Sequence, residues 1–290
     1  MKLGKPKTRD QLSRPPCGEK PPDGYPRTCF RSIDDPYFNG EVWFYKMITP
    51  FINKIYDVGA DTTFYTNFHG EVHYFEPVDN SNIFQAESEI FKGNNILGNG
   101  KSYFNNYGLS ETTSENLKIT WEAGDVAPNP DGDNIELGDN VYMKTKRADE
   151  YMIENDHDYV DFVSVDVEGH ELPVLKGFGD MLQKVGVVQF EHGGCTYSAG
   201  YKLSEIIKYL KQHGFWGFSY LDTTLFRNWY EIGSKAVYSK HRLVPLNWDD
   251  DCEDHYAYSN IVCVNENFLE PGKKLVKEFN GTHRRFEWPE

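Results

Sequence analysis

The sequence predicts an α/β domain in which a mostly parallel sheet carries helices on both faces. Three observations support this class. Short apolar runs typical of strands alternate along the chain with segments of helical periodicity. Several runs are apolar throughout, as expected for strands buried on both faces. Four of them end in charged residues, and open α/β sheets bind their ligands at the carboxyl ends of their strands.

The 290-residue chain divides into three predicted regions. Residues 1–40 begin with a stretch rich in Pro, Lys and Arg, and we expect an extended or loosely packed arm there. Residues 41–268 contain the alternating strands and helices of the domain. Residues 269–290 form a C-terminal tail.

The strands follow from apolar runs bounded by turn residues. They are expected at 54–60, 71–78, 102–110, 116–122, 159–167, 185–194, 216–222 and 259–266, and in a stretch that begins at 141 and passes into a helix near Ala148. The helices follow from a spacing of three and four residues and from Gly at their ends. They are expected at 82–93, after Ala148, at 171–183 and at 203–215, with a short helix or packing segment at 41–52. In the segment 203–215, Leu203, Ile206, Ile207 and Leu210 share one face.

The first candidate site follows the strand at 54–60. Gly59 and Ala60 allow a tight turn and a close approach of the backbone to a ligand. Glu76 ends the next strand, 19 positions after Asp57. This spacing is typical of the acidic residue that accepts hydrogen bonds from a ribose in nucleotide-binding folds. The alternative is an ordinary strand, turn and helix with a surface glutamate.

The second candidate site is the stretch "SVDVEGHE". Asp166 and Glu168 lie on the same side while the strand continues, and His170 follows in the loop. Two carboxylates and an imidazole could bind a divalent metal or move a proton. The alternative is an acidic helix start, stabilised by the helix dipole, and we assign Glu171 to that role.

Two further strand ends carry ionisable residues. Glu191 and His192 end the strand at 185–194 and precede two glycines, so they could join Asp166 or simply be solvated. Asp149 could face the same region, but a helix cap is the favoured interpretation.

The composition of the chain argues against some classes of binding partner. The chain has 30 Lys and Arg against 45 Asp and Glu, a net charge of −15, which argues against a nucleic-acid binder. We also expect no membrane span, because no window of about 18 apolar residues occurs. Five cysteines without a CxxC pair and an N-terminus without an apolar core favour a cytoplasmic protein with reduced thiols.

Taken together, these stretches resemble the FkbM family of S-adenosylmethionine-dependent methyltransferases. The resemblance covers about Phe51 to Val264 and is most specific in "VDVEGHELPVLKG". The other matching stretches are "IYDVGADTTFYT", "HYFEPV", "NYGLS", "VVQFEHGG" and "YSNIVCVN".

The family implies a Rossmann-like class I methyltransferase with a seven-stranded sheet. Its members typically methylate hydroxyl oxygens on sugars, polyketides or other small metabolites, and the family pattern requires no metal. A small molecule or glycan is therefore the expected acceptor, and residues 123–139 and 222–258 are expected to shape its pocket.

The resemblance also assigns roles by position. Asp57, Gly59 and Ala60 would hold the methionine part of S-adenosylmethionine, and Glu76 would take the ribose. The residues facing cofactor and acceptor would be Asp166 and Glu168, with His170. The base that removes the acceptor proton could be His170, His192 or Asp166.

The chain departs from the family pattern in the first loop. Asp61 and Thr63 stand where the family usually has Asn and the last Gly, so both belong to the expected cofactor-binding set in altered form. Two other functions stay open. One is a glycosyltransferase that holds a metal and a nucleotide-sugar at "DVE". The other is a non-catalytic binding module that has lost the cofactor through Asp61 and Thr63.

Overall fold

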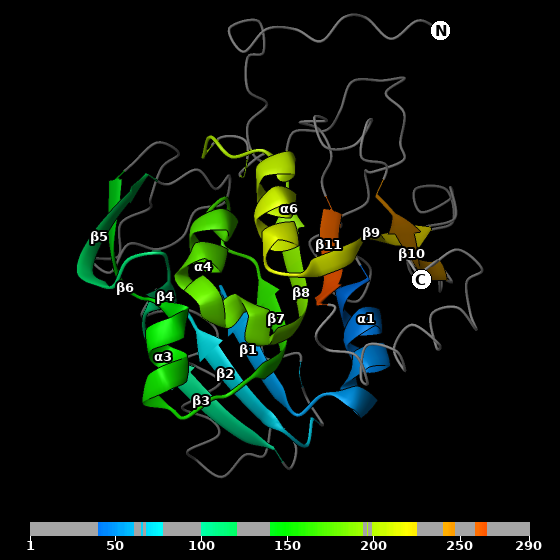
Figure 1. Ribbon diagram of the computed structural model, residues 1–290, viewed down its shortest axis with the longest axis horizontal. Helices are drawn as coiled ribbons and strands as arrows, with labels where there is room; N and C mark the ends of the chain where they lie inside the picture. The colour runs from blue at the N-terminus through cyan, green and yellow to red at the C-terminus, as the bar shows by residue number, and fades with distance from the viewer. Residues whose placement is uncertain are drawn as a thin grey trace, which may run out of the picture.

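The structure is a computed structural model, and it describes most of the predicted domain (Figure 1). The described residues are 40–60, 65, 68–77, 100–120, 140–193, 196, 199–224, 240–246 and 259–265. Apart from Gly40, the predicted arm lies outside them, as do the predicted tail and the predicted helix at 82–93. Asp61 and Thr63 also lie outside the described residues.

The described residues can be compared with two expectations, namely that the chain has no membrane span and that its cysteines are reduced. No helix among these residues is long and apolar enough to cross a membrane. The one described cysteine, Cys263, is buried and has a free thiol.

The centre of the fold is an eight-stranded sheet. Its spatial order is β10 (Lys240–Pro245), β9 (Phe215–Thr224), β11 (Ser259–Asn265), β8 (Val185–His192), β7 (Val160–Val165), β1 (Lys54–Val58), β2 (Glu71–Phe75) and β3 (Lys101–Asn105). The five strands from β8 to β3 are parallel. β11 runs antiparallel to β8 and β9, and β10 runs antiparallel to β9.

This arrangement confirms the predicted α/β class with a mostly parallel sheet. A seven-stranded sheet, as the resemblance implied, is present from β9 to β3. β10 extends it by one strand, and it lies within the segment 222–258 that was expected to shape the acceptor pocket.

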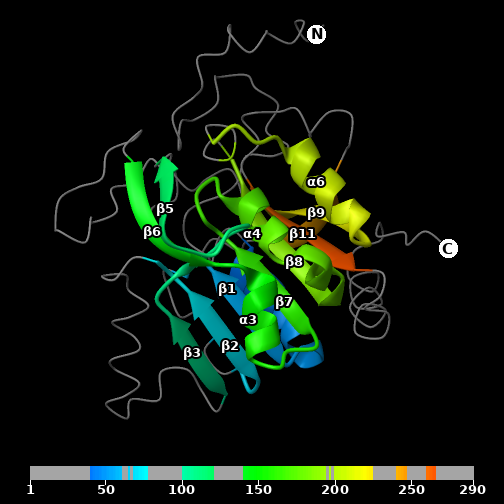
Figure 2. The ribbon, with the colours of Figure 1, turned by 60° about the vertical axis from the view of Figure 1, so that its left-hand side comes forward.

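A second, smaller sheet leads into the helices. It consists of β4 (Gly108–Leu109), β6 (Asn140–Lys146) and β5 (Ser114–Thr120), with β6 in the middle. Figure 2 shows β5 and β6 side by side. The single strand expected at 102–110 is therefore two strands, because Asn106 and Tyr107 interrupt it and β4 pairs with β6 instead.

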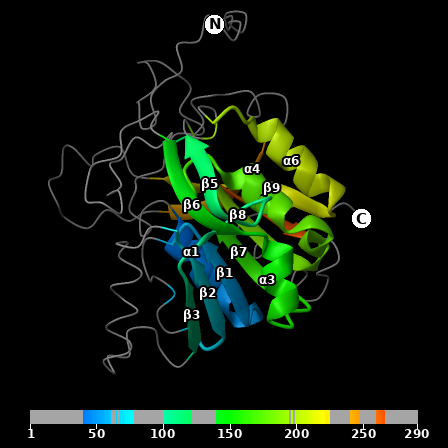
Figure 3. The same cartoon turned by 90° about the vertical axis from the view of Figure 1, so that its left-hand side faces the viewer.

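Helices cover both faces of the large sheet, as predicted (Figure 3). One face carries α3 (Ala148–Glu154), α4 (Glu171–Gly177), the 3-10 helix η3 (Gly179–Lys184) and α6 (Leu203–Gln212). The other carries α1 (Glu41–Ile48), which continues into the 3-10 helix η2 (Thr49–Phe51). The four apolar residues predicted for one face of α6 are all fully buried.

Strand alternation decides which side chains meet which helices. In β1, Tyr56 and Val58 pack in the core under α3 and α4, whereas Ile55 packs in the core under α1. Asp57 shares the face of Ile55, so the sheet directs its carboxylate toward the α1 side.

Candidate active site at the carboxyl ends of the strands

The ends of β1, β2 and β7 lie side by side. The Gly59 amide donates to the Phe75 carbonyl oxygen at 2.9 Å, and the Asp166 amide donates to the Val58 carbonyl oxygen at 2.9 Å. Glu76 directly follows Phe75, so the residues that follow the three strands are neighbours. The structure therefore brings together Gly59, Glu76 and Asp166, which the sequence predicted to share a site.

At these strand ends the direction in which successive strands are added to the sheet reverses. From β1 the chain continues to β2 and β3 on one side, and later returns to place β7 and β8 on the other side. Ligands of open α/β sheets bind at such a switch point, outside the carboxyl ends of the strands. Gly59 and Asp166 lie on its two sides.

Gly59 is required by backbone geometry. Its φ is +83°, and a Cβ atom added to it would lie 1.7 Å from the Asp166 carbonyl oxygen. Only glycine allows this approach without displacing a neighbouring backbone. The next residue, Ala60, is buried, and its amide donates to the Phe75 carbonyl oxygen at 3.4 Å.

Asp57 is a buried carboxyl among other acidic groups. Burial is the main cause that raises its pKa well above the ordinary value, and the negative charges of Glu41, Asp166 and Glu76 raise it further. The Tyr65 hydroxyl lies 3.5 Å from Asp57 Oδ1 and acts in the opposite direction. These contributions identify a group of acidic side chains close enough to interact electrostatically.

Glu41 is a member of this group that the sequence analysis missed. It begins α1 and is buried, and its Oε1 accepts a hydrogen bond from Gln189 Nε2 at 2.9 Å. Gln189 Nε2 also lies 3.2 Å from Asn260 Oδ1. No local motif marks Glu41, because its position depends on how α1 packs against the sheet.

A second group of carboxylates lies on the β7 and β8 side of Asp166. Asp166, Glu168 and Glu191 each offer a carboxylate oxygen, and these oxygens lie within 4.8 Å of one another. Glu168 has a φ of +52° and Gly169 a φ of +103°, so the chain turns sharply after β7. Glu191 is almost fully buried. Three such carboxylates could hold a hard divalent cation or face a cationic ligand.

Glu171 lies in the first turn of α4, at the helix start predicted for it, and its carboxylate also makes buried contacts. Its side chain is 1% exposed, and burial raises its pKa to about 7. The Gly169 amide donates to Oε1 at 2.9 Å, and the Thr196 hydroxyl donates to Oε2 at 3.2 Å. Glu171 therefore joins the loop after β7 to the segment after β8.

The two candidate histidines lie apart from the group formed by Asp166, Glu168 and Glu191. His192 follows Phe190 on the α6 side of β8, whereas Glu191 points to the opposite face. His192 is fully buried, and burial lowers its pKa to about 3. His170 Nε2 lies 3.0 Å from Ser110 Oγ, and burial lowers its pKa to about 4.

Asp149 is not the cap of α3. The N-cap residue is Arg147, which makes no side-chain cap. Asp149 Oδ1 accepts hydrogen bonds from Arg147 Nε at 2.9 Å and from the Glu150 amide at 2.8 Å. Its carboxylate is thus engaged in an ion pair with Arg147.

A comparison with models of known protein families matches the part of the chain that contains the candidate site. The family model described as the methyltransferase FkbM domain matches residues 55–216, more than half of the chain. This range includes Asp57, Glu76, Asp166 and Glu191. Comparison with curated proteins and with solved structures gave no match. The chain therefore belongs to the FkbM methyltransferase family.

Proposed function

We propose that the protein is an S-adenosylmethionine-dependent O-methyltransferase of the Rossmann-like class I type, acting on a hydroxyl group of a sugar, glycan or other small metabolite. The observation that carries this proposal is the convergence of Gly59, Glu76 and Asp166 at the switch point of the sheet. Membership of a methyltransferase family supports it independently.

The charge of the site suits this cofactor. S-adenosylmethionine has a sulfonium and an ammonium group, and its ribose presents two hydroxyls. In this proposal Glu76 accepts hydrogen bonds from the ribose hydroxyls, while Asp57 faces the methionine part. A buried cluster of carboxyl groups repels itself, so a bound cation relieves that repulsion.

The cofactor supplies an electrophilic methyl group, and the protein must align the acceptor hydroxyl and accept its proton. In this proposal the base is one of the carboxylates of Asp166, Glu168 and Glu191, which lie together. The alternatives His192 and His170 are less suited, because His192 is fully buried and His170 contacts Ser110.

Calorimetric titration with S-adenosylmethionine and with S-adenosylhomocysteine tests the proposal. We expect one bound equivalent of each, followed by transfer of a labelled methyl group to a hydroxylated acceptor in a panel of sugars and metabolites. Absence of binding at millimolar cofactor would contradict the proposal and favour a non-catalytic module. Binding of a nucleotide-sugar that requires Mn²⁺ would instead favour a glycosyltransferase.

A further inference from the structure

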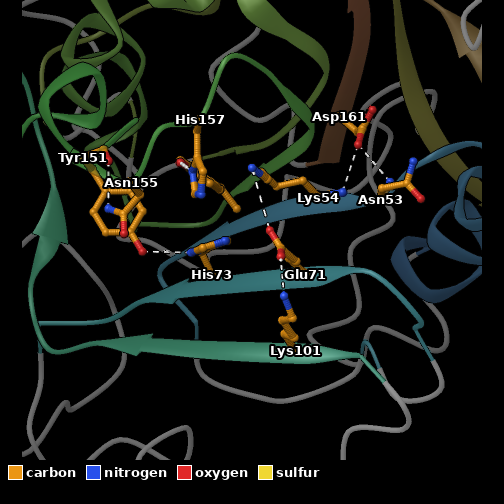
Figure 4. A network of polar contacts seen from close by, with 10 residues as sticks. Asn53, Lys54, Glu71, His73, Lys101, Tyr151, Asn155, His157 and Asp161 are labelled. Carbon is orange, nitrogen blue, oxygen red and sulfur yellow. Dashed lines mark hydrogen bonds and ion pairs between the residues drawn. The ribbon is translucent and has the colours of Figure 1, made fainter. Parts of the chain in front are cut away.

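A second cluster of potential ligands lies away from the candidate active site. It consists of Glu71 and His73 on β2 and His157 in the loop between α3 and β7, and their ligand atoms lie within 4.8 Å of one another (Figure 4). Glu71 is the first residue of β2, so the cluster lies toward the end of the strand opposite Glu76. The rings of His73 and His157 pack edge to face with centroids 4.7 Å apart.

Both imidazoles are held by tyrosine hydroxyls through Nδ1. His73 Nδ1 lies 2.8 Å from Tyr151 Oη, and His157 Nδ1 lies 2.5 Å from Tyr56 Oη. In the tautomer with its proton on Nδ1, each imidazole donates to the tyrosine oxygen and presents the lone pair of Nε2. Hydrogen bonds of this kind orient the histidines of metal sites.

His73 provides the observation that points to a ligand. The residue is 2% exposed, and its Nε2 atom is buried with no hydrogen-bond partner among the described residues. Buried polar atoms are normally paired, so an unpaired one requires an explanation.

Ordinary packing explains only part of this cluster. Tyr103 stacks on His73 at a centroid distance of 4.5 Å, and Glu71 lies between Lys54 and Lys101 in a row across three strands. These contacts account for the ring position of His73 and the charge of Glu71. Within the described part of the chain, they leave His73 Nε2 without a hydrogen-bond partner.

We propose that Glu71, His73 and His157 form a site for a divalent transition-metal ion such as Zn²⁺. Two imidazoles and one carboxylate are a known zinc ligand set, with a water molecule in the fourth position. Tetrahedral Zn²⁺ requires ligand atoms roughly 3.4 Å apart, and the three ligand atoms here lie within 4.8 Å of one another. The partly exposed Glu71 can move by exchanging its lysine partners for the metal.

The bound ion would connect β2 to the loop that precedes β7. This inference goes beyond the proposed function, because none of the three ligands contributes to the carboxylate groups around Asp57 and Asp166. It can therefore be tested without a methyl acceptor.

The test uses the full chain after removal of metal with a chelator. Titration with Zn²⁺ by calorimetry, and with Co²⁺ by visible absorption, should show one site with the spectrum of a tetrahedral ion bound by nitrogen and oxygen. Zn²⁺ should also raise the Tm of the protein. Failure to bind either ion, or binding without a tetrahedral Co²⁺ spectrum, overturns the proposal.

Three variants locate the site. Glu71→Gln should weaken Zn²⁺ affinity at least tenfold, and His157→Gln should remove the tetrahedral Co²⁺ spectrum. His213→Gln is the matched control, because His213 contacts the Tyr209 carbonyl oxygen at the end of α6, and it should bind both metals as the wild type does. Unchanged binding in both Glu71→Gln and His157→Gln would place the metal elsewhere and overturn the proposal. Because Glu71 is partly exposed, its variant is expected to fold.

Discussion

The backbone of Asp166 lies against Gly59, so closely that a Cβ atom on Gly59 would be 1.7 Å from the Asp166 carbonyl oxygen. The contact joins the ends of β1 and β7 at the switch point of the sheet. It sets the separation of the two strand ends from which the proposed cofactor site is built.

Gly59→Ala should therefore lower the free energy of unfolding by about 2–5 kcal/mol, because it adds backbone strain to a steric clash. Gly200→Ala is the matched control, since Gly200 also has a positive φ of +91° but has no atom of the described residues within 4 Å of an added Cβ. The control should lose only about 1–2 kcal/mol. Chemical denaturation measures the free energy of unfolding of both variants. Equal losses would show that the close contact with Asp166 does not affect stability.

Glu76→Gln should weaken binding of S-adenosylhomocysteine by about 1–3 kcal/mol, because the ribose hydroxyls lose a charged acceptor. Calorimetry measures the change. Glu115→Gln is a suitable control, because Glu115 is 82% exposed and pairs with Lys144 on the small sheet. Unchanged affinity in Glu76→Gln would remove Glu76 from the proposed site.

Asp57→Asn should have opposite effects on stability and binding. The ligand-free protein should become more stable by about 1 kcal/mol or more at neutral pH, because ionisation of Asp57 is opposed by burial and by Glu41 and Asp166. Affinity for S-adenosylmethionine should fall roughly tenfold or more, because a charged hydrogen-bond acceptor is lost. Denaturation and calorimetry measure the two effects.

Asp180→Asn, at an exposed position in η3, should change neither property. Loss of both stability and affinity in Asp57→Asn would instead assign Asp57 to the support of the fold.

Glu171 should make stability depend on pH. Its folded pKa of about 7 exceeds the ordinary value of 4.5, so the folded state binds the proton more tightly than the unfolded state. Its contribution is complete below pH 4.5 and is lost as the pH rises through 7. The wild type should therefore lose up to a few kcal/mol relative to Glu171→Gln over this range.

Urea denaturation of both proteins across this pH range measures the difference. Comparison with the neutral variant isolates Glu171 from Asp57, whose raised pKa acts in the same direction. A constant difference in stability between wild type and variant would mean that Glu171 stays in one protonation state throughout.

Much of the fold could be predicted because its signals are local. The apolar face of α6 and its four buried residues follow from spacing alone. The start of α3 at Ala148 also agrees with the sequence. β10 and the division of the strand at 102–110 were missed, because strand pairing depends on which edge another segment can reach.

The candidate site was only partly predictable for the same reason. The rule that parallel strands end at one edge was enough to place Asp57, Glu76 and Asp166 together. It could not find Glu41, which reaches Asp57 only because α1 crosses the face of the sheet.

The sequence by itself determined the α/β class, the family and the acidic strand ends, because each depends on residues close together in the chain. Only the tertiary structure decided that Glu191 faces Asp166 while His192 enters the core under α6, because a strand exposes alternate residues to opposite faces and the packing selects the face. It also decided that Glu71, His73 and His157 meet, because β2 and the loop before β7 are brought together by folding.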